Sequence, residues 1–134
     1  MKKKLLTALA AALALSLSCA VPASAAFEDF TDVDGHWAKD TLSQAFRDGI
    51  MTGNGPTTMS PNKSVTTAQA VTILSRVLNV TGQEQVDLPQ GAWYAEYAAK
   101  AVYAGLLDRE ALDTLDEPIT RGEAFLLFGR AFQV

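Results

Sequence analysis

The chain has 134 residues, with 11 Lys or Arg against 15 Asp or Glu and a formal net charge of −4 at pH 7. This acidic balance argues against wholesale binding to nucleic acid or to an anionic membrane, because both require a basic surface. The single cysteine, Cys19, excludes a disulfide within the chain.

The first 25 residues have the pattern of a secretory signal peptide. Three lysines at positions 2–4 precede an apolar run over residues 5–17, and Ala23-Ser24-Ala25 supplies a small-x-small cleavage site. The apolar run is shorter than the roughly 18 residues of a membrane-spanning helix. We therefore expect export and cleavage, which leave 109 residues with eight basic and 15 acidic side chains. A minor alternative is lipoprotein anchoring at Cys19.

The remainder of the chain contains an internal repeat, which we assign as unit 1 over 26–79, a polar connector over 80–86 and unit 2 over 87–134. Up to position 59 the two copies are offset by 56 residues, and from position 65 by 54, as a two-residue deletion in the second loop would produce. The matched pairs are Trp37/Trp93, Ala45/Ala101, Gly49/Gly105, Met59/Leu115, Thr66/Thr120 and Arg76/Arg130. A repeat of this length indicates that one supersecondary unit occurs twice.

Unit 1 is predicted to be helix, loop, helix. Apolar residues at i, i+4, i+7 and i+8 predict a helix over 38–46, and Gly49 follows it where a left-handed cap is wanted. Residues 52–58 are dense in helix breakers and predict a loop, followed by a short extended segment at 59–61. A second helix is expected from Thr66 through Leu78.

Unit 2 is predicted to repeat this scheme. We expect a helix over 94–103, a stop at Gly105, a loop through Leu115 and a last helix over 121–132. Neither unit can bury its apolar face alone, so the two units should pack together. The predicted fold class is mainly α.

These motifs resemble the S-layer homology (SLH) domain. Unit 1 carries FTDV at 30–33, HWA at 36–38, GI at 49–50 and VTTAQ at 65–69, where the family pattern is F-x-D-V, H-W-A, G-I and I/V-T-R-A-E. Unit 2 resembles a diverged copy, with ITRGE at 119–123. The resemblance implies tandem helix-loop-helix repeats packed as a partial pseudo-threefold helical prism.

The resemblance also implies a function. SLH modules hold exported proteins non-covalently on the bacterial cell wall, typically through a secondary wall polysaccharide with pyruvylated sugars, or through peptidoglycan in some lineages. The chain is therefore expected to be a secreted surface anchor of the cell wall or S-layer and not an enzyme, with no cofactor and no metal. Because only two repeats are present, an alternative is a structural protein that completes a prism with another SLH chain or a second copy of itself.

The start of the last helix contains the principal candidate for ligand binding. Thr120 and Glu123 match a capping box, as do Thr66 and Gln69 in unit 1, so helix capping explains those four residues. Arg121 is left unexplained, because a cation at a helix start opposes the macrodipole. In the family this arginine is tied to the acidic ligand, and a guanidinium binds carboxylates bidentately. Ion pairing with Glu117 or Glu123 is the alternative interpretation.

Other candidates have a structural alternative. Trp37 and Trp93 could stack on a sugar ring or pack in the core. The glycines could admit a ligand to the main chain or supply positive φ; these are Gly49, Gly53 and Gly105. We expect Asp32 to cap or brace the turn into the first helix and His36 to be a hydrogen-bonded structural residue.

Overall fold

The structure is a computed structural model and describes residues 26–133. The predicted signal peptide and Cys19 lie outside these residues. The helical elements in chain order are η1 (Phe27–Asp29), η2 (Thr31–Val33), α2 (Lys39–Arg47), α3 (Thr67–Val77), α4 (Ala95–Tyr103), η3 (Arg109–Thr114) and α5 (Arg121–Phe132). Apart from one isolated bridge between Thr66 and Pro118, the described part of the chain has no β-structure, which confirms the mainly α class.

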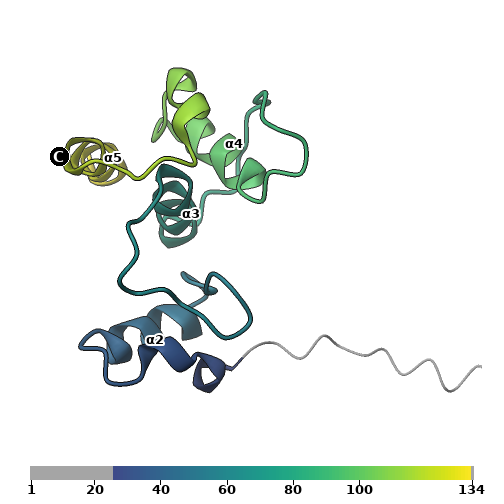
Figure 1. Cartoon of the computed structure of the whole chain (residues 1–134). Helices are drawn as coiled ribbons and strands as arrows, with labels where there is room; N and C mark the ends of the chain where they lie inside the picture. Colours follow the sequence, from purple (N-terminus) through teal and green to yellow (C-terminus); the bar gives the residue numbers. More distant parts are fainter. Residues whose placement is uncertain (1–25, 134) are drawn as a thin grey trace, which may run out of the picture.

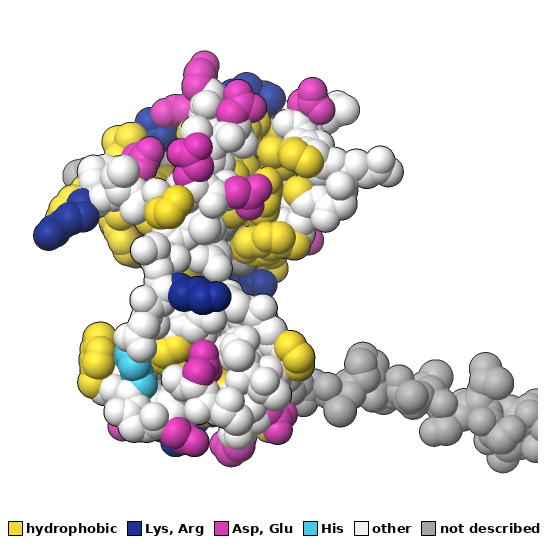
Figure 2. Space-filling view, viewed as in Figure 1, with side chains coloured by type: hydrophobic (Ala, Val, Ile, Leu, Met, Phe, Trp, Pro, Cys, Tyr) yellow, Lys and Arg dark blue, Asp and Glu magenta, His cyan; other side chains and the backbone are white. Residues whose placement is uncertain are grey.

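The chain forms two lobes joined by a narrow waist. One lobe surrounds α2, and the other contains α3, α4 and α5 (Figure 1). The space-filling view shows how little material connects them (Figure 2). The second helix of unit 1 therefore lies with unit 2 and not with the first helix of its own unit.

The larger core lies where α3 packs on α4, the helix pair with the most extensive contact in the described chain. Three alanines with no exposed surface allow the two helices to approach each other: Ala68, Ala98 and Ala101. Val71 and Leu74 of α3 are buried against them. Unit 2 closes the cluster with Tyr94, Leu106, Leu107, Leu115 and Leu127. The two units thus pack together as expected, and they do so through α3 of unit 1 and α4 of unit 2.

A smaller core belongs to the α2 lobe. Its centre is an aromatic group in which the Phe30 ring lies 5.8 Å from that of Phe27 and 5.4 Å from that of Phe46, both edge to face. Asp32 fastens the distant loop onto this group, because its carboxylate accepts the backbone N–H groups of Met59 at 2.9 Å and Ser60 at 2.7 Å. Asp32 thus braces η2 against residues 59–60 and does not cap α2.

The same local motifs recur at the repeat spacing. After α2, Ile50 N–H donates to Ala45 C=O and Gly49 N–H to Phe46 C=O, which is a Schellman cap; the same pair of bonds follows α4 around Gly105. An arginine then ties each second helix to the end of the first. Arg76 Nη1 donates to Ile50 C=O at 3.0 Å, and Arg130 Nη1 donates to Leu106 C=O at 3.2 Å.

Two details differ from the sequence prediction. The short 3-10 helices η1, η2 and η3 were not predicted, because they lack the apolar periodicity of a longer helix. The segment at 59–61 is not extended throughout: Ser60 has φ 55°, a left-handed conformation held by the bond from its N–H to Asp32.

Gly53→Ala is expected to destabilise the α2 lobe by roughly 2–5 kcal/mol, the sum of the cost of a left-handed backbone at a non-glycine residue and the cost of overpacking. Gly53 has φ 83°, and a Cβ there would lie 2.6 Å from the Phe30 ring. Gly35→Ala is the matched control, because Gly35 has φ 73° but no neighbour within 4 Å. Urea unfolding should show the smaller loss, about 1 kcal/mol, for Gly35→Ala. Equal losses would contradict a packing role for Gly53.

Acidification should weaken the α2 lobe through Asp32. The N–H groups of Met59 and Ser60 hold the pKa of Asp32 below its ordinary value. A carboxyl whose pKa is lowered by folding stabilises the fold above its unfolded pKa, about 4, and this contribution is lost as pH falls through the folded pKa. The urea midpoint of Asp32→Asn should therefore lie below that of the parent protein at pH 7, and the difference should be smaller at pH 3. A difference that is the same at both pH values would refute this assignment.

Candidate functional site

The N-terminus of α5 presents Arg121 in the first helical position. Thr120 caps the helix by accepting the N–H of Glu123 at 3.2 Å. The Glu123 carboxylate turns back to accept the Thr120 N–H at 2.8 Å and its hydroxyl at 2.7 Å. These bonds, chiefly that from the Thr120 hydroxyl, hold the pKa of Glu123 below its ordinary value. Glu123 is therefore engaged in the capping box and not with Arg121.

Arg121 itself is exposed and unpaired. Within residues 26–133 its side chain has no ion-pair or hydrogen-bond partner, so the alternative of pairing with Glu117 or Glu123 does not occur here. No backbone carbonyl of these residues accepts the N–H groups of Arg121 or Gly122. A guanidinium and two unsatisfied helix-start N–H donors thus face solvent together, an arrangement suited to a carboxylate.

The matching position in unit 1 is covered. Thr66 and Gln69 form the same capping box at the start of α3. The next two N–H groups, however, have acceptors in unit 2: Thr67 donates to Glu117 C=O and Ala68 to Leu115 C=O. Thr67 is only 7% exposed. An arginine at position 67 would have to be accommodated inside the contact between the units.

Both tryptophans lie on the surface. Trp37 is 91% exposed and contacts the His36 ring, whereas Trp93 is 59% exposed and meets Tyr94 edge to face at 5.5 Å. The packing alternative is therefore wrong for these two side chains. Trp37 precedes α2 and Trp93 precedes α4, so Trp93 shares its lobe with Arg121 and Trp37 does not (Figure 1).

The candidate glycines separate into two kinds. Gly49 and Gly105 supply the left-handed residue of the two Schellman caps, with φ 71° and 69°, and open space surrounds both. At Gly53 the space beside the Cα is filled by the Phe30 ring, so this side of the residue offers a ligand no room.

His36 has the structural role expected for it. Its Nδ1 accepts the N–H of Ala38 at 3.1 Å at the entry to α2, which requires the proton to be on Nε2. That nitrogen lies 3.2 Å from the Asn62 side-chain oxygen. Both ring nitrogens are thus engaged.

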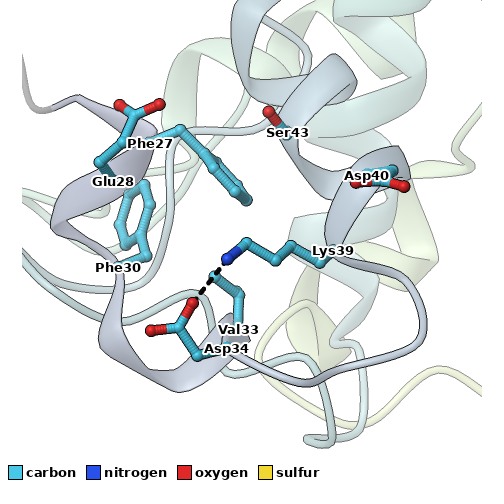
Figure 3. A pocket seen from close by; sticks show the side chains of 8 residues that line it. All are labelled: Phe27, Glu28, Phe30, Val33, Asp34, Lys39, Asp40 and Ser43. Carbon is cyan, nitrogen blue, oxygen red and sulfur yellow. Dashed lines mark hydrogen bonds and ion pairs between the residues drawn. The ribbon is translucent and has the colours of Figure 1, made fainter.

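A pocket of about 370 Å³ between η1 and α2 was not predicted from the sequence (Figure 3). Its polar lining is mostly acidic, with Glu28, Asp34 and Asp40, and Lys39 is bound to Asp34 at 2.6 Å. This ion pair raises the pKa of Lys39. The surplus of carboxylates makes the pocket unsuited to an anionic sugar. A second pocket of about 410 Å³ occupies the corresponding place beside the start of α4, with Glu84 and Glu96 in its lining.

Neither pocket includes Arg121, Trp37 or Trp93. Among the described residues, no group of His, Cys, Asp and Glu side chains could hold a metal ion. Within the same residues, every helix is too short or too polar to cross a membrane.

Comparisons with known proteins identify a family domain within the chain. Residues 29–71 match the sequence model of the S-layer homology domain. The chain is 31% identical over 118 residues to an amylopullulanase from Thermoanaerobacterium thermosulfurigenes, an alignment that covers 82% of this chain and 6% of that protein. It is 31% identical over 91 residues to the S-layer protein of Bacillus thuringiensis subsp. finitimus, covering 64% of this chain and 11% of that protein.

A third relative is the surface-layer 125 kDa protein of Lysinibacillus sphaericus, 26% identical over 129 residues, or 92% of this chain and 11% of that protein. The chain thus spans about a tenth or less of the length of these relatives. The longer alignments extend beyond residues 29–71 into unit 2. The chain therefore carries an S-layer homology domain at residues 29–71 and is a relative of bacterial S-layer proteins.

Proposed function

We propose that this protein anchors to the bacterial cell surface by binding an anionic wall glycan non-covalently, with Arg121 as the residue that recognises the ligand's carboxylate. We further propose that residues 87–134 are a second, diverged SLH repeat. The proposal is supported by the SLH match over residues 29–71 and by relatives that are S-layer proteins.

The observation that carries the role of Arg121 is its lack of partners. A guanidinium that pairs with a neighbouring carboxylate is neutralised, but Glu123 is occupied by Thr120 and leaves Arg121 available. A pyruvyl ketal places a carboxylate on a sugar. Such a group could accept the guanidinium fork together with the N–H groups of Arg121 and Gly122.

Trp93 is the better of the two tryptophans for the sugar ring. Its neighbour Tyr94 donates a hydrogen bond to Asp116 at 2.9 Å, which attaches the start of α4 to the segment that leads into α5. An exposed indole on this rigid support offers a flat apolar face in the same lobe as Arg121.

The similarity to an amylopullulanase does not favour an enzymatic function. The alignment covers 6% of that protein. The similarity is therefore confined to a small part of a far longer protein, and a small part is enough to attach such a protein to the wall.

Arg121→Ala should weaken binding to wall sacculi roughly tenfold or more, as expected for loss of hydrogen bonds to a charged group. Co-sedimentation of purified protein with sacculi measures this. Arg47→Ala is the control, because it removes the same charge from an exposed side chain that bonds only within α2. Sacculi stripped of their acid-labile polysaccharide should bind neither the Arg121→Ala variant nor the Arg47→Ala variant. Equal binding by Arg121→Ala and Arg47→Ala would refute the role of Arg121.

Trp93→Ala should reduce sedimentation with intact sacculi more than Trp37→Ala does, because only Trp93 shares a lobe with Arg121. Both side chains are exposed, so both variants should keep the unfolding midpoint of the parent protein. A larger loss from Trp37→Ala would move the proposed sugar contact to the α2 lobe.

A further inference from the structure

The outer face of α5 exposes four large apolar side chains. They are Phe125 at 71% exposure, Leu126 at 53%, Phe128 at 52% and Phe132 at 53%. The Phe128 and Phe132 rings stack with centroids 6.1 Å apart, so the face is continuous along one turn. Contiguous apolar surface of this kind on a small protein marks an interaction site.

The repeat shows what such a face contacts elsewhere in this chain. At the 54-residue offset, Phe125 corresponds to Val71 and Phe128 to Leu74 on α3, which are 0% and 4% exposed. They lie in one core cluster with Ala98 and Ala101 of α4, which is the first helix of the next unit and the helix that α3 contacts most. By this correspondence, the outer face of α5 is the surface on which the first helix of a following unit would pack.

The first helix of unit 1, α2, lacks the kind of partner that α4 has in α3. At the 56-residue offset α2 corresponds to α4, and Ala45 corresponds to Ala101, which is fully buried against α3. On α2 no residue is buried, and within residues 26–133 this helix packs mainly on η1. We propose that α5 of one copy binds α2 of a second copy, head to tail, in the geometry of the α3–α4 contact.

This template assigns individual contacts. In the α3–α4 contact, Arg76 Nε donates to the Tyr97 hydroxyl at 3.1 Å, and the guanidinium lies 4.8 Å from the ring centre. The corresponding pair between copies is Arg130 with the exposed Thr41. Ala68, which lets α3 approach α4, corresponds to Gly122, so a close approach is also open at the start of α5.

The contact is heterologous, because one patch meets a different patch. Each copy therefore keeps one free α2 and one free α5 until a ring closes. The association itself needs no glycan, but in the α3–α4 geometry residues 59 and 61 of the second copy take the places of Leu115 and Glu117, so this contact would cover the N–H groups of Gly122 and Arg121. Phe128 lies two helical turns from Arg121, so a substitution there tests association separately from the proposed ligand site.

Complementation between two variants tests the proposal. Sedimentation velocity of the protein without its signal peptide, at micromolar concentrations, should give an average mass above that of the monomer. Phe128→Glu removes the α5 patch, and Thr41→Arg places a bulky cation on α2 opposite Arg130. Each variant alone should be monomeric, with association weakened at least roughly tenfold. Their equimolar mixture should form a 1:1 dimer, because one variant retains α2 and the other retains α5.

Tyr103→Glu is the control for replacing an exposed aromatic residue with an acid. Tyr103 is 58% exposed, and its counterpart in unit 1 is the charged Arg47, so the position tolerates charge. This variant should associate as the parent does. A parent protein that stays monomeric overturns the proposal, as does a Thr41→Arg variant that still dimerises, which would indicate α5 against α5. Monomers that float with phosphatidylcholine vesicles would assign the patch to a lipid surface instead.

Discussion

The packing of α3 on α4 is the constraint on which the rest of the structure depends. A single helix-loop-helix unit exposes an apolar helix face that its own residues cannot cover. This chain covers the face on α3 with the first helix of the next unit, and the fully buried alanines 68, 98 and 101 set how closely the two helices approach. The larger core therefore lies between units, and the first helix of unit 1 is left in a lobe of its own, joined through the waist in Figure 2.

The same contact makes the two capping boxes chemically different. Both boxes start a helix with a threonine and a Glu or Gln side chain, and both leave two further N–H donors. At α3 those donors are satisfied by Leu115 and Glu117 carbonyls of unit 2, and Thr67 fits the covered space. At α5 no described residue supplies such carbonyls, so the donors and Arg121 face solvent. Whether a helix start is structural or a candidate binding site therefore depends more on whether a following unit covers it than on its capping motif.

Attachment between the two lobes depends on few polar contacts. Arg76 reaches the Ile50 carbonyl at the end of α2 and the Tyr97 ring on α4, and the Gln69 amide donates to the Asn54 side chain at 3.2 Å. The α2 lobe is held internally by three phenylalanine rings and the Asp32 carboxylate. Each lobe therefore has its own core, and Arg76 contacts both lobes.

The sequence by itself determined the four α-helices, their caps and their order, because these depend on residues close together in the chain. The α5 bounds of Arg121–Phe132, the capping boxes and the glycine stops all follow from local patterns. The sequence did not determine which helices would meet, the surface positions of Trp37 and Trp93, or the contact of Asp32 with Met59 and Ser60. Those features depend on residues distant in sequence, and only the tertiary structure decided them, because burial is a property of which faces the fold brings together and not of any one segment.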